Sequence, residues 1–492
     1  MARGPLTGLR MALLLLTAVE LVVFLDVSIV NVALPSMAAT LALGEAGLAW
    51  VVNAYQLTFG GFQLVGGRAS DILGRRRVFR IGLTIFTVAS LLAGLAPWAW
   101  LLILARALQG VGAALVVPAE LALLTSVFTE PRAYQRAFGV WSAMGAAGAA
   151  SGVALGGILT QEVGWPWIFL VNVPIGIVAL AFSGRYLPAD EQHRVVDTTV
   201  TRTLDVWGAI TGTGGLILLV YVLSVVPQEG WDPLVTGALV VAVGLLVAFA
   251  AIERRVANPL LPLRLFRIRN VTGSAAANFM VGAAHVPAFV FLSLYFQDVL
   301  HYSPIAAGFA VLPIALMNVA VSRAVVPWAL ARLGPRMVLA AGFALLVVGL
   351  GGLGFAPTDG EYAIDVLPYA LVFAVGLPAI FVGSTLPAVK SVRSTDTGIV
   401  SGTVNTTQRI GSSVGVTLLT VLAVLRTNSA ADPSTAAALN SGYAIGFLGA
   451  AGFAVLGLLI AVTILTPLPT DPELTGAPRT AAREDIPAGD QT

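Results

Sequence analysis

Long apolar segments recur along the whole chain, and they constrain its fold more than any other feature. Each segment is about 20 residues long, which is the length that a helix needs to cross a hydrocarbon layer about 30 Å thick. Only 11% of the 492 residues are charged, and 57% are hydrophobic. A soluble chain would carry about 25% charged residues. Lipid must therefore surround much of the folded chain, and we predict an all-α membrane protein.

The apolar segments predict fourteen transmembrane helices. The first segment follows Arg3 and Arg10 and continues to about Leu34, which is longer than the apolar region of a cleavable signal peptide. We therefore expect it to be a retained helix. The tail from Pro467 is polar, and we expect it to be disordered. The predicted helices span residues 9–35, 47–66, 78–96, 99–125, 137–161, 166–187, 205–226, 233–253, 271–297, 304–325, 337–356, 363–389, 399–425 and 443–466.

Basic residues are distributed unequally between the predicted loops, and this asymmetry indicates the orientation. Most arginines and Lys390 fall in alternate loops, whereas the opposite loops carry Arg426 and mainly acidic residues. Loops rich in Lys and Arg stay in the cytoplasm. We therefore expect a multi-pass protein of the bacterial cytoplasmic (inner) membrane, with both termini in the cytoplasm.

A short internal repeat indicates two related halves. The segment 73–78 reads LGRRRV and the segment 333–338 reads LGPRMV, at an offset of 260 residues. This offset predicts two six-helix bundles with two extra helices between them. The predicted units are 1–190, 191–258 and 259–466, followed by a cytoplasmic tail at 467–492. In transporters built from such repeats, the substrate site lies near the midplane between the halves.

Two charged residues of opposite sign are predicted at a similar depth in the membrane. An ionisable side chain at the centre of a membrane helix costs about 2.5–3.5 kcal/mol on insertion scales and points to function. Asp26 lies about 13 Å, and Arg106 about 10 Å, from the outer ends of their helices at 1.5 Å per residue. Burial favours the protonated carboxyl group and an arginine favours the carboxylate. The pair could couple transport to protons, or it could be a static ion pair.

Further acidic residues are candidates for the same region. Glu20 shares a helix face with Asn31 and could be a second acid of a proton relay, a site for a cationic substrate, or a carboxylate near the inner water boundary. Glu120 shares a stripe with Arg106 and Gln109. We expect Glu120 and Gln109 to face a central cavity, although a cap or surface contact explains Glu120 equally well.

One histidine lies deep in a predicted helix. Adding the repeat offset of 260 residues, less one, to the position of Asp26 gives the position of His285. His285 lies on the same helix stripe as Asn278. Histidine titrates near neutral pH, which suits a proton carrier. A buried histidine that donates to a backbone carbonyl is the alternative. We place both residues in the predicted cavity.

Several motifs in order along the chain resemble those of the major facilitator superfamily, and within it the fourteen-helix drug:proton antiporters. The resemblance covers nearly all of residues 9–466. The motifs are LDVSIVNVALP at 25–35, GRASDILGRR at 67–76, RALQGVG at 106–112, the glycines of helix 137–161, WIFLVNVPIG at 167–176 and YFQDVL at 295–300. The resemblance implies the major facilitator fold and multidrug efflux by alternating access, with antibiotic resistance as a consequence.

The resemblance also implies roles for two sets of residues. The loop after the second helix implies a cytoplasmic gate between the halves, although ordinary cytoplasmic positive charge also explains Arg76. Its residues are Gly67, Asp71, Gly74, Arg75 and Arg76. The glycines of the antiporter helix imply a sliding face, although they could equally mark tight helix packing. These glycines are Gly139, Gly148, Gly152, Gly156 and Gly157.

Absent features limit the function classes. The chain has no cysteine, which excludes disulfides and thiolate chemistry, and a net charge of +2 does not suggest nucleic-acid binding. No Walker lysine motif occurs, so we expect no nucleotide, metal or other cofactor, and a proton gradient as the driving force. The predicted function is export of lipophilic, cationic small molecules or drugs by a monomer in the lipid bilayer. The alternatives are a dedicated transporter of a single metabolite (an antibiotic, amino acid or lipid) and an intramembrane enzyme or receptor.

Overall fold

The computed structural model describes residues 5–190, 205–229, 231–256, 259, 263–392 and 397–466. The predicted cytoplasmic tail at 467–492 lies outside these residues, as does the segment 191–204. Throughout the described ranges the regular structure is helical, so the prediction of an all-α protein is confirmed. The helices are α1 (Pro5–Leu41), α2 (Glu45–Leu73), α3 (Arg75–Gly94), α4 (Ala99–Val127), α5 (Pro131–Glu162), α6 (Trp167–Leu170), α7 (Asn172–Tyr186), α8 (Val206–Glu229), α9 (Pro233–Arg255), α10 (Arg269–Leu294), α11 (Pro304–Ala324), α12 (Val326–Leu353), α13 (Leu367–Lys390), α14 (Thr397–Asn428) and α15 (Ala436–Thr463).

Twelve helices of the described chain are long and apolar enough to cross a membrane. Two other predicted spans, 47–66 and 137–161, fall within α2 and α5, which are 29 and 32 residues long and are not among these twelve. The total of fourteen membrane-crossing helices therefore stays a prediction at these two positions. Most helices extend beyond the predicted bounds, because polar residues at their ends remain helical.

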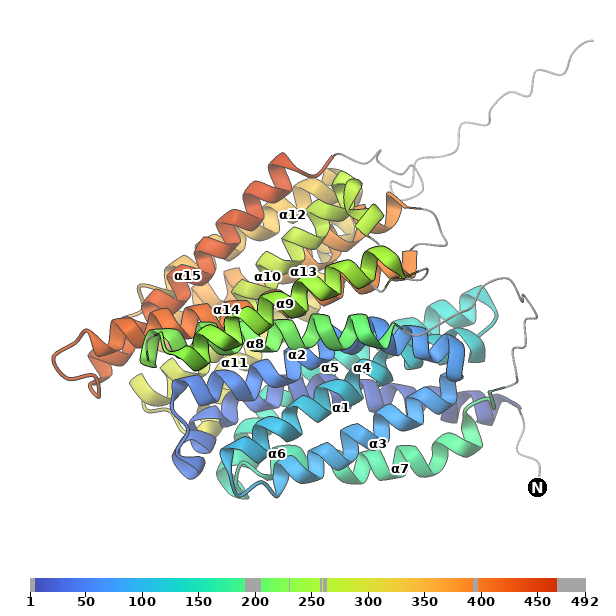
Figure 1. The fold of residues 1–492 in the computed structure, drawn as a ribbon, viewed down its shortest axis with the longest axis horizontal. Helices are drawn as coiled ribbons and strands as arrows, with labels where there is room; N and C mark the ends of the chain where they lie inside the picture. The colour runs from blue at the N-terminus through green and yellow to red at the C-terminus, as the bar shows by residue number, and fades with distance from the viewer. Residues whose placement is uncertain are drawn as a thin grey trace, which may run out of the picture.

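The helices form two groups with a hairpin beside them (Figure 1). Within the N-terminal group, α1 packs on α5, and α4 packs on α2 and α3. Within the C-terminal group, α12 packs on α13 and α15, and α10 packs on α14. We call these groups the N-terminal half (α1–α7) and the C-terminal half (α10–α15). The predicted unit boundaries at 190 and 258 adjoin undescribed residues and stay predictions.

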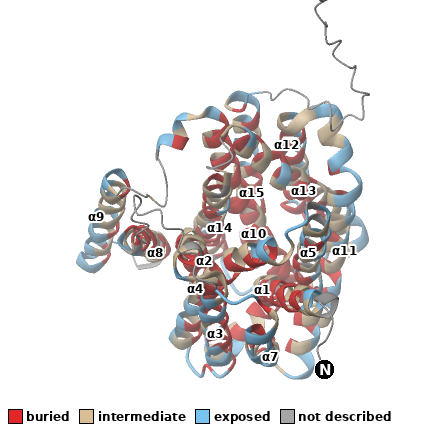
Figure 2. Ribbon diagram, turned by 90° about the vertical axis from the view of Figure 1, so that its right-hand side faces the viewer, coloured by how far each residue is buried: buried red, intermediate tan, exposed pale blue. Residues whose placement is uncertain are grey.

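The α8–α9 hairpin lies outside the two halves. In Figure 2, α8 lies beside α2 and α14, and α9 lies at the margin of the molecule. Few residues of the apolar span of α9 are buried, so most of its surface is free to meet lipid. This position agrees with two extra helices added to a twelve-helix core.

Two glycines with positive φ mark the internal repeat. Gly74, between α2 and α3, has φ 101°, and Gly334, at a sharp kink inside α12, has φ 75°. Such backbone angles favour glycine because it lacks a Cβ atom. The repeated sequence therefore builds the same kind of helix–helix turn in both halves. The span predicted at 166–187 corresponds to Trp167–Tyr186, in which Val171, between α6 and α7, keeps helical backbone angles (φ −61°, ψ −27°).

The two halves are hydrogen-bonded along two seams. At the end of α1, the Ser293 hydroxyl and the Gln297 amide donate to the backbone carbonyls of Asn31 and Val32, at 2.8 and 3.0 Å. Along α2 and α14, Asn53 Nδ2 donates to Thr417 Oγ1 at 2.8 Å. Figure 1 shows the helices of the two halves diverging from this joined end towards the opposite end.

Candidate functional site

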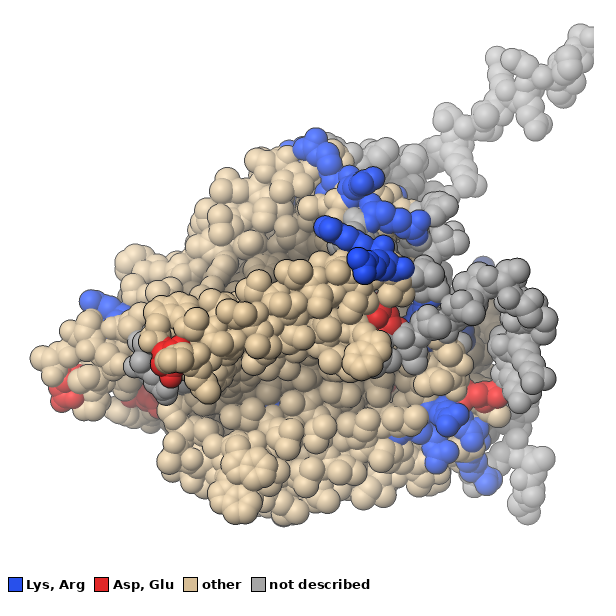
Figure 3. All heavy atoms as spheres, in the orientation of Figure 1, with Lys and Arg blue, Asp and Glu red and all other residues tan. Residues whose placement is uncertain are grey.

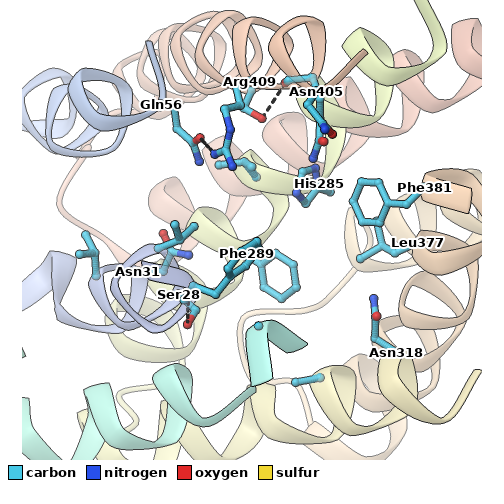
Figure 4. Close-up of a pocket in the computed structure, with 18 of the residues that line it drawn as sticks. Ser28, Asn31, Gln56, His285, Phe289, Asn318, Leu377, Phe381, Asn405 and Arg409 are labelled. Carbon is cyan, nitrogen blue, oxygen red and sulfur yellow. Dashed lines mark hydrogen bonds between the residues drawn. The ribbon is translucent and has the colours of Figure 1, made fainter. Parts of the chain in front are cut away.

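A cavity of about 580 Å³ lies between the two halves. Its wall combines aromatic rings, amides and a few ionisable side chains, and both halves contribute to it (Figure 4). This composition suits an amphipathic organic molecule, because apolar walls bind its body and a few polar groups orient it. The polar and aromatic lining residues include Glu20, Phe24, Asn31, Gln56, Arg106, Trp141, Asn278, His285, Phe289, Asn318, Phe381, Asn405, Gln408 and Arg409.

The structure brings Asp26 and Arg106 together in the N-terminal half. Arg106 Nη1 donates to Asp26 Oδ2 at 2.7 Å, and both side chains are almost fully buried. Asp26 Oδ1 accepts two further hydrogen bonds, from Gln109 Nε2 at 3.0 Å and Asn172 Nδ2 at 2.8 Å. Three donors therefore hold the carboxylate, and they join α1 to α4 and α7.

The cage around Asp26 lies behind the cavity wall. Arg106 lines the cavity, but Asp26 and Gln109 do not, and both are 0% exposed. Gln109 also donates to Ser90 Oγ at 2.9 Å, which turns it towards α3. The expectation that Gln109 faces the cavity is therefore corrected: its amide is used to hold Asp26.

A second acidic group lies on the cavity side. Glu20 lines the cavity, and Glu120, which is 0% exposed, lies close behind it. Trp141 Nε1 donates to Glu120 Oε2 at 3.4 Å, whereas Glu20 Oε2 and Glu120 Oε1 are buried without a hydrogen-bond partner among the described residues. Neither glutamate forms an ion pair with a described residue, although the charge of Arg409 acts on Glu20. Glu120 thus lies behind Glu20 and does not line the cavity itself, contrary to expectation.

Glu20 and Glu120 are two buried acids close to each other, with no positive charge paired to either in the described chain. Like charges held close together in an apolar site disfavour the doubly ionised state. Such a pair takes up and releases protons as a unit. The Glu20–Glu120 pair is therefore chemically able to exchange a proton with water or with a cationic ligand in the cavity.

Three of the predicted cavity residues do line it: Asn31, Asn278 and His285. His285 Nδ1 lies 2.8 Å from the Val281 carbonyl, and its ring meets Phe381 edge-on. This is the backbone-bonded arrangement that the sequence left open. Asn278 Nδ2 donates to the Ser274 carbonyl at 2.9 Å, which leaves its carbonyl oxygen as the group available to a ligand.

Arg409 is a cavity residue that the sequence reasoning missed. It lies on α14, inside the predicted span 399–425, and its guanidinium carbon lies 3.4 Å from the centre of the Phe59 ring. Arg409 Nη1 donates to Gln56 Oε1 at 3.0 Å. A charged residue inside a membrane helix points to function, as at Asp26 and Arg106. The same reasoning identifies Arg409.

The predicted gating loop makes its described contacts within the N-terminal half. Arg75 Nη1 donates to the Ala122 carbonyl at 2.9 Å, and Arg76 Nη1 donates to the Leu187 carbonyl at 3.3 Å. The backbone N–H groups of Arg76 and Arg77 donate to the Asp190 carboxylate at 2.9 and 3.0 Å. Gly74 faces this carboxylate, and a Cβ atom there would collide with it, whereas Gly67 has room for one. A gating role stays a prediction.

The glycines of α5 divide into three groups. Gly148, Gly152 and Gly156 lie directly against the α1 backbone, where a Cβ atom would collide with Leu21, Ser28 and Ile29. Gly157 lies against the start of α11 in the other half. Gly139 is exposed and has no neighbour for a Cβ atom. The track therefore gives tight packing of α5 on α1, while Gly157 alone of these five contacts the C-terminal half.

The described residues contain no group of three or more His, Cys, Asp or Glu side chains placed to hold a metal ion. The chemistry that the cavity does offer is proton exchange at Glu20, charge at Arg409 and hydrogen bonding at the amides.

Comparison with known proteins identifies the family. Residues 16–416 match the family model of the Major Facilitator Superfamily. The chain is 36% identical over 491 residues to the puromycin resistance protein pur8 of Streptomyces alboniger, covering 99% of this chain and 96% of that protein. It is 37% identical to the cephamycin export protein CmcT of Amycolatopsis lactamdurans, covering 93% and 92%.

Solved structures agree on the fold. A bacterial homologue of the human lysosomal transporter Spinster, in an inward-facing and unoccupied conformation, superposes with a TM-score of 0.66 at 14% identity, covering 94% of this chain and 99% of that one. A D-xylose–proton symporter gives a TM-score of 0.65 at 11% identity, covering 93% and 98%. The resemblance seen in the motifs is thus confirmed, and the chain belongs to the major facilitator superfamily, as a multi-pass membrane transporter of the branch whose members include antibiotic export and resistance proteins.

Proposed function

We propose that this protein exports lipophilic, cationic small molecules from the cytoplasm in exchange for protons. Relatives named for puromycin resistance, cephamycin export and lincomycin resistance support drug-like substrates. The aromatic and amide lining of the central cavity supports an amphipathic substrate of similar size. We further propose that the protein works as a monomer in the cytoplasmic membrane and needs no cofactor beyond the proton gradient.

The observation that carries the proposal is the Glu20–Glu120 pair at the cavity wall. A carboxylate there can hold either a proton or the positive charge of a substrate, but binding of one opposes binding of the other. Substrate binding therefore releases the proton, and protonation releases the substrate. Exchange of one proton for one singly charged cation moves no net charge, so the pH difference across the membrane drives it, and one pH unit supplies about 1.4 kcal/mol, which sustains about tenfold accumulation.

Asp26 and Arg106 take a different part in this proposal. In the arrangement described, three donors hold the Asp26 carboxylate and protein covers it on all sides. A proton can reach it only after α1, α4 or α7 moves. We infer that the pair responds to the change between conformations, whereas Glu20 meets the substrate directly.

The distribution of charge supports the proposed orientation. In Figure 3 the basic side chains gather at the right-hand end of the molecule and are sparse at the left-hand end. The hydrogen bonds of Ser293 and Gln297 join the halves at the end of α1 remote from Arg75 to Arg77. With the arginine-rich end in the cytoplasm, this is an inward-facing arrangement that receives substrate from the cytoplasm.

Purified protein in liposomes with an imposed pH gradient tests the proposed function. Uptake of a cationic rhodamine ester into inside-acidic vesicles should be fast for the natural protein and should collapse with an ionophore. The Glu20→Gln variant should lose gradient-driven uptake. Glu162→Gln, at the exposed end of α5, serves as a charge-matched control and should keep it. Equal uptake by Glu20→Gln and the natural protein would contradict the proposal.

A further inference from the structure

Two arginines line the central cavity, and they differ in how their charge is neutralised. Arg106 is paired with the Asp26 carboxylate at 2.7 Å. Arg409 forms no ion pair with any described carboxylate, and its contacts are the Gln56 amide oxygen and the face of Phe59. A guanidinium at membrane depth is costly and is almost always paired in membrane proteins. Arg409 therefore stands out as a cation whose protein contacts do not balance its charge.

Most of the N–H donors of Arg409 do not bond to an acceptor among the described residues. A guanidinium has five N–H donors, and Gln56 accepts from one nitrogen, Nη1. Gln56 and Phe59 both lie on α2, so they hold the guanidinium from that side. Figure 4 shows Arg409 at the margin of the cavity, with Gln56 on one side and His285 and Asn405 on the other. The remaining donors are suited to a ligand in this space.

The surroundings reinforce an anion site. Asn405 and Gln408, on the same turn of α14, also line the cavity, as does Asn278 on α10. The amide N–H groups of Asn405 and Gln408 can add donors to the guanidinium. The one acidic side chain of the cavity wall among the described residues, Glu20, forms no ion pair with Arg409, although the two charges act on each other. Phe289 and Phe381 supply apolar surface for the body of a ligand.

We propose that Arg409 is the anion-binding subsite of this cavity, and that its ligands carry a carboxylate as well as the positive group received by Glu20. The planar guanidinium matches a carboxylate in two parallel hydrogen bonds, which a lysine cannot reproduce. The proposal rests on the proposed export function and narrows its substrate class to zwitterionic amphipathic molecules.

Equilibrium binding to purified protein tests this subsite without any transport. The probes are a rhodamine free acid, which is zwitterionic, and its methyl ester, which is cationic and otherwise identical. Fluorescence anisotropy gives the dissociation constant of each probe, and their ratio isolates the contribution of the carboxylate. Charge-assisted hydrogen bonds of this kind change affinity by about tenfold or more.

The natural protein should bind the acid more tightly than the ester after correction for their binding to detergent. Arg409→Gln should lower this preference about tenfold, while binding of the ester persists. Arg409→Lys should retain part of it, which also shows that position 409 tolerates change. Arg323→Gln, an exposed arginine of the same half, is the matched control and should leave the ratio unchanged.

An unchanged acid-to-ester ratio in Arg409→Gln, or no binding of the acid by the natural protein, would overturn the proposal. A change in the ratio together with absent proton-driven uptake would support the anion subsite while contradicting the proposed export function. The two ideas can thus fail separately.

Discussion

Glu20, in the wall of the central cavity, lies in front of the buried Glu120, and one carboxyl oxygen of each lacks a hydrogen-bond partner among the described residues. Six residues further along α1, the Asp26 carboxylate is held by Arg106, Gln109 and Asn172. The same helix therefore presents two acids in opposite environments. The first lacks an ion-pair partner in the described chain and faces the ligand space, and the second is neutralised and enclosed.

The Asp26–Arg106 pair predicts a strong loss of transport and stability in single variants. Asp26→Asn leaves the Arg106 charge without its partner, which costs about 3–5 kcal/mol in buried pairs. Gradient-driven efflux should be abolished. Thermal unfolding of the detergent-solubilised variant measures the loss of stability, and vesicle uptake measures activity.

The double variant Asp26→Asn with Arg106→Gln separates charge imbalance from proton coupling. It removes the uncompensated charge, so it should recover part of the lost stability without recovering transport. Recovery of full transport in the double variant would show that Asp26 acts only as a structural partner of Arg106.

The α5 glycines predict a position-dependent effect of one added methyl group. Gly148→Ala places a Cβ atom against the Leu21 backbone, and such overpacking costs about 1–3 kcal/mol. Gly139→Ala adds the same group on the same helix where nothing lies within 4 Å. The melting temperature should fall for the first variant and not for the second. Equal melting temperatures would contradict the close α1–α5 contact.

The glycines of the internal repeat predict a graded cost of substitution. Both have positive φ, a backbone region that costs other residues about 1–3 kcal/mol. Gly334→Ala should cost this strain alone, because no atom lies within 4 Å of its added Cβ. Gly74→Ala should cost more, because its Cβ would also collide with Asp190. Chemical or thermal unfolding of the two variants checks the order, and the reverse order would contradict the turn geometry.

The contacts at the joined end predict control of the conformational equilibrium. Replacing both Ser293 and Gln297 by alanine removes their hydrogen bonds to the α1 carbonyls, so the halves should separate there and approach each other at the arginine-rich end. The chain has no cysteine, so labels at Thr125→Cys and Leu333→Cys are unique. Electron double resonance should show a shift to shorter distances between these labels.

Ser429→Ala provides the control for that measurement. Its hydroxyl bonds only to the Arg426 carbonyl nearby, at 2.7 Å, and the residue is exposed. In this variant the distances between the two labels should match those in the labelled protein that keeps Ser293, Gln297 and Ser429. Unchanged distances in the Ser293/Gln297 variant would show that these contacts do not hold the inward-facing arrangement.

Much of the architecture follows from sequence because lipid imposes a simple rule. A segment in hydrocarbon must satisfy its own backbone hydrogen bonds, so long apolar runs become helices. The turns at Gly74 and Gly334 likewise follow from the repeated Leu-Gly pair, because glycine adopts the positive φ that other residues avoid. The helical segment 326–333, between the predicted spans 304–325 and 337–356, was not predicted, because hydropathy does not distinguish a polar helical turn from a loop.

The side-chain partners were harder to predict. Asp26 and Arg106 were predicted at a similar depth, but depth does not tell in which direction each side chain points around its helix. The third donor to Asp26, Asn172, lies on a different helix, α7. Glu120 shares a stripe with Gln109, yet Glu120 lies beside Glu20 whereas Gln109 bonds to Asp26. These pairings depend on how α1, α4 and α7 pack, which no pattern within a single helix contains.

Proton release on substrate binding is the most direct test of the exchange at Glu20 and Glu120. A cationic rhodamine ester is added to the purified protein in weakly buffered detergent solution, and a pH-indicator dye records the protons set free. We predict that the natural protein and Arg323→Gln release protons in proportion to ligand bound, and that the variant Glu20→Gln with Glu120→Gln binds ligand without release. Undiminished release by that double variant would contradict the account.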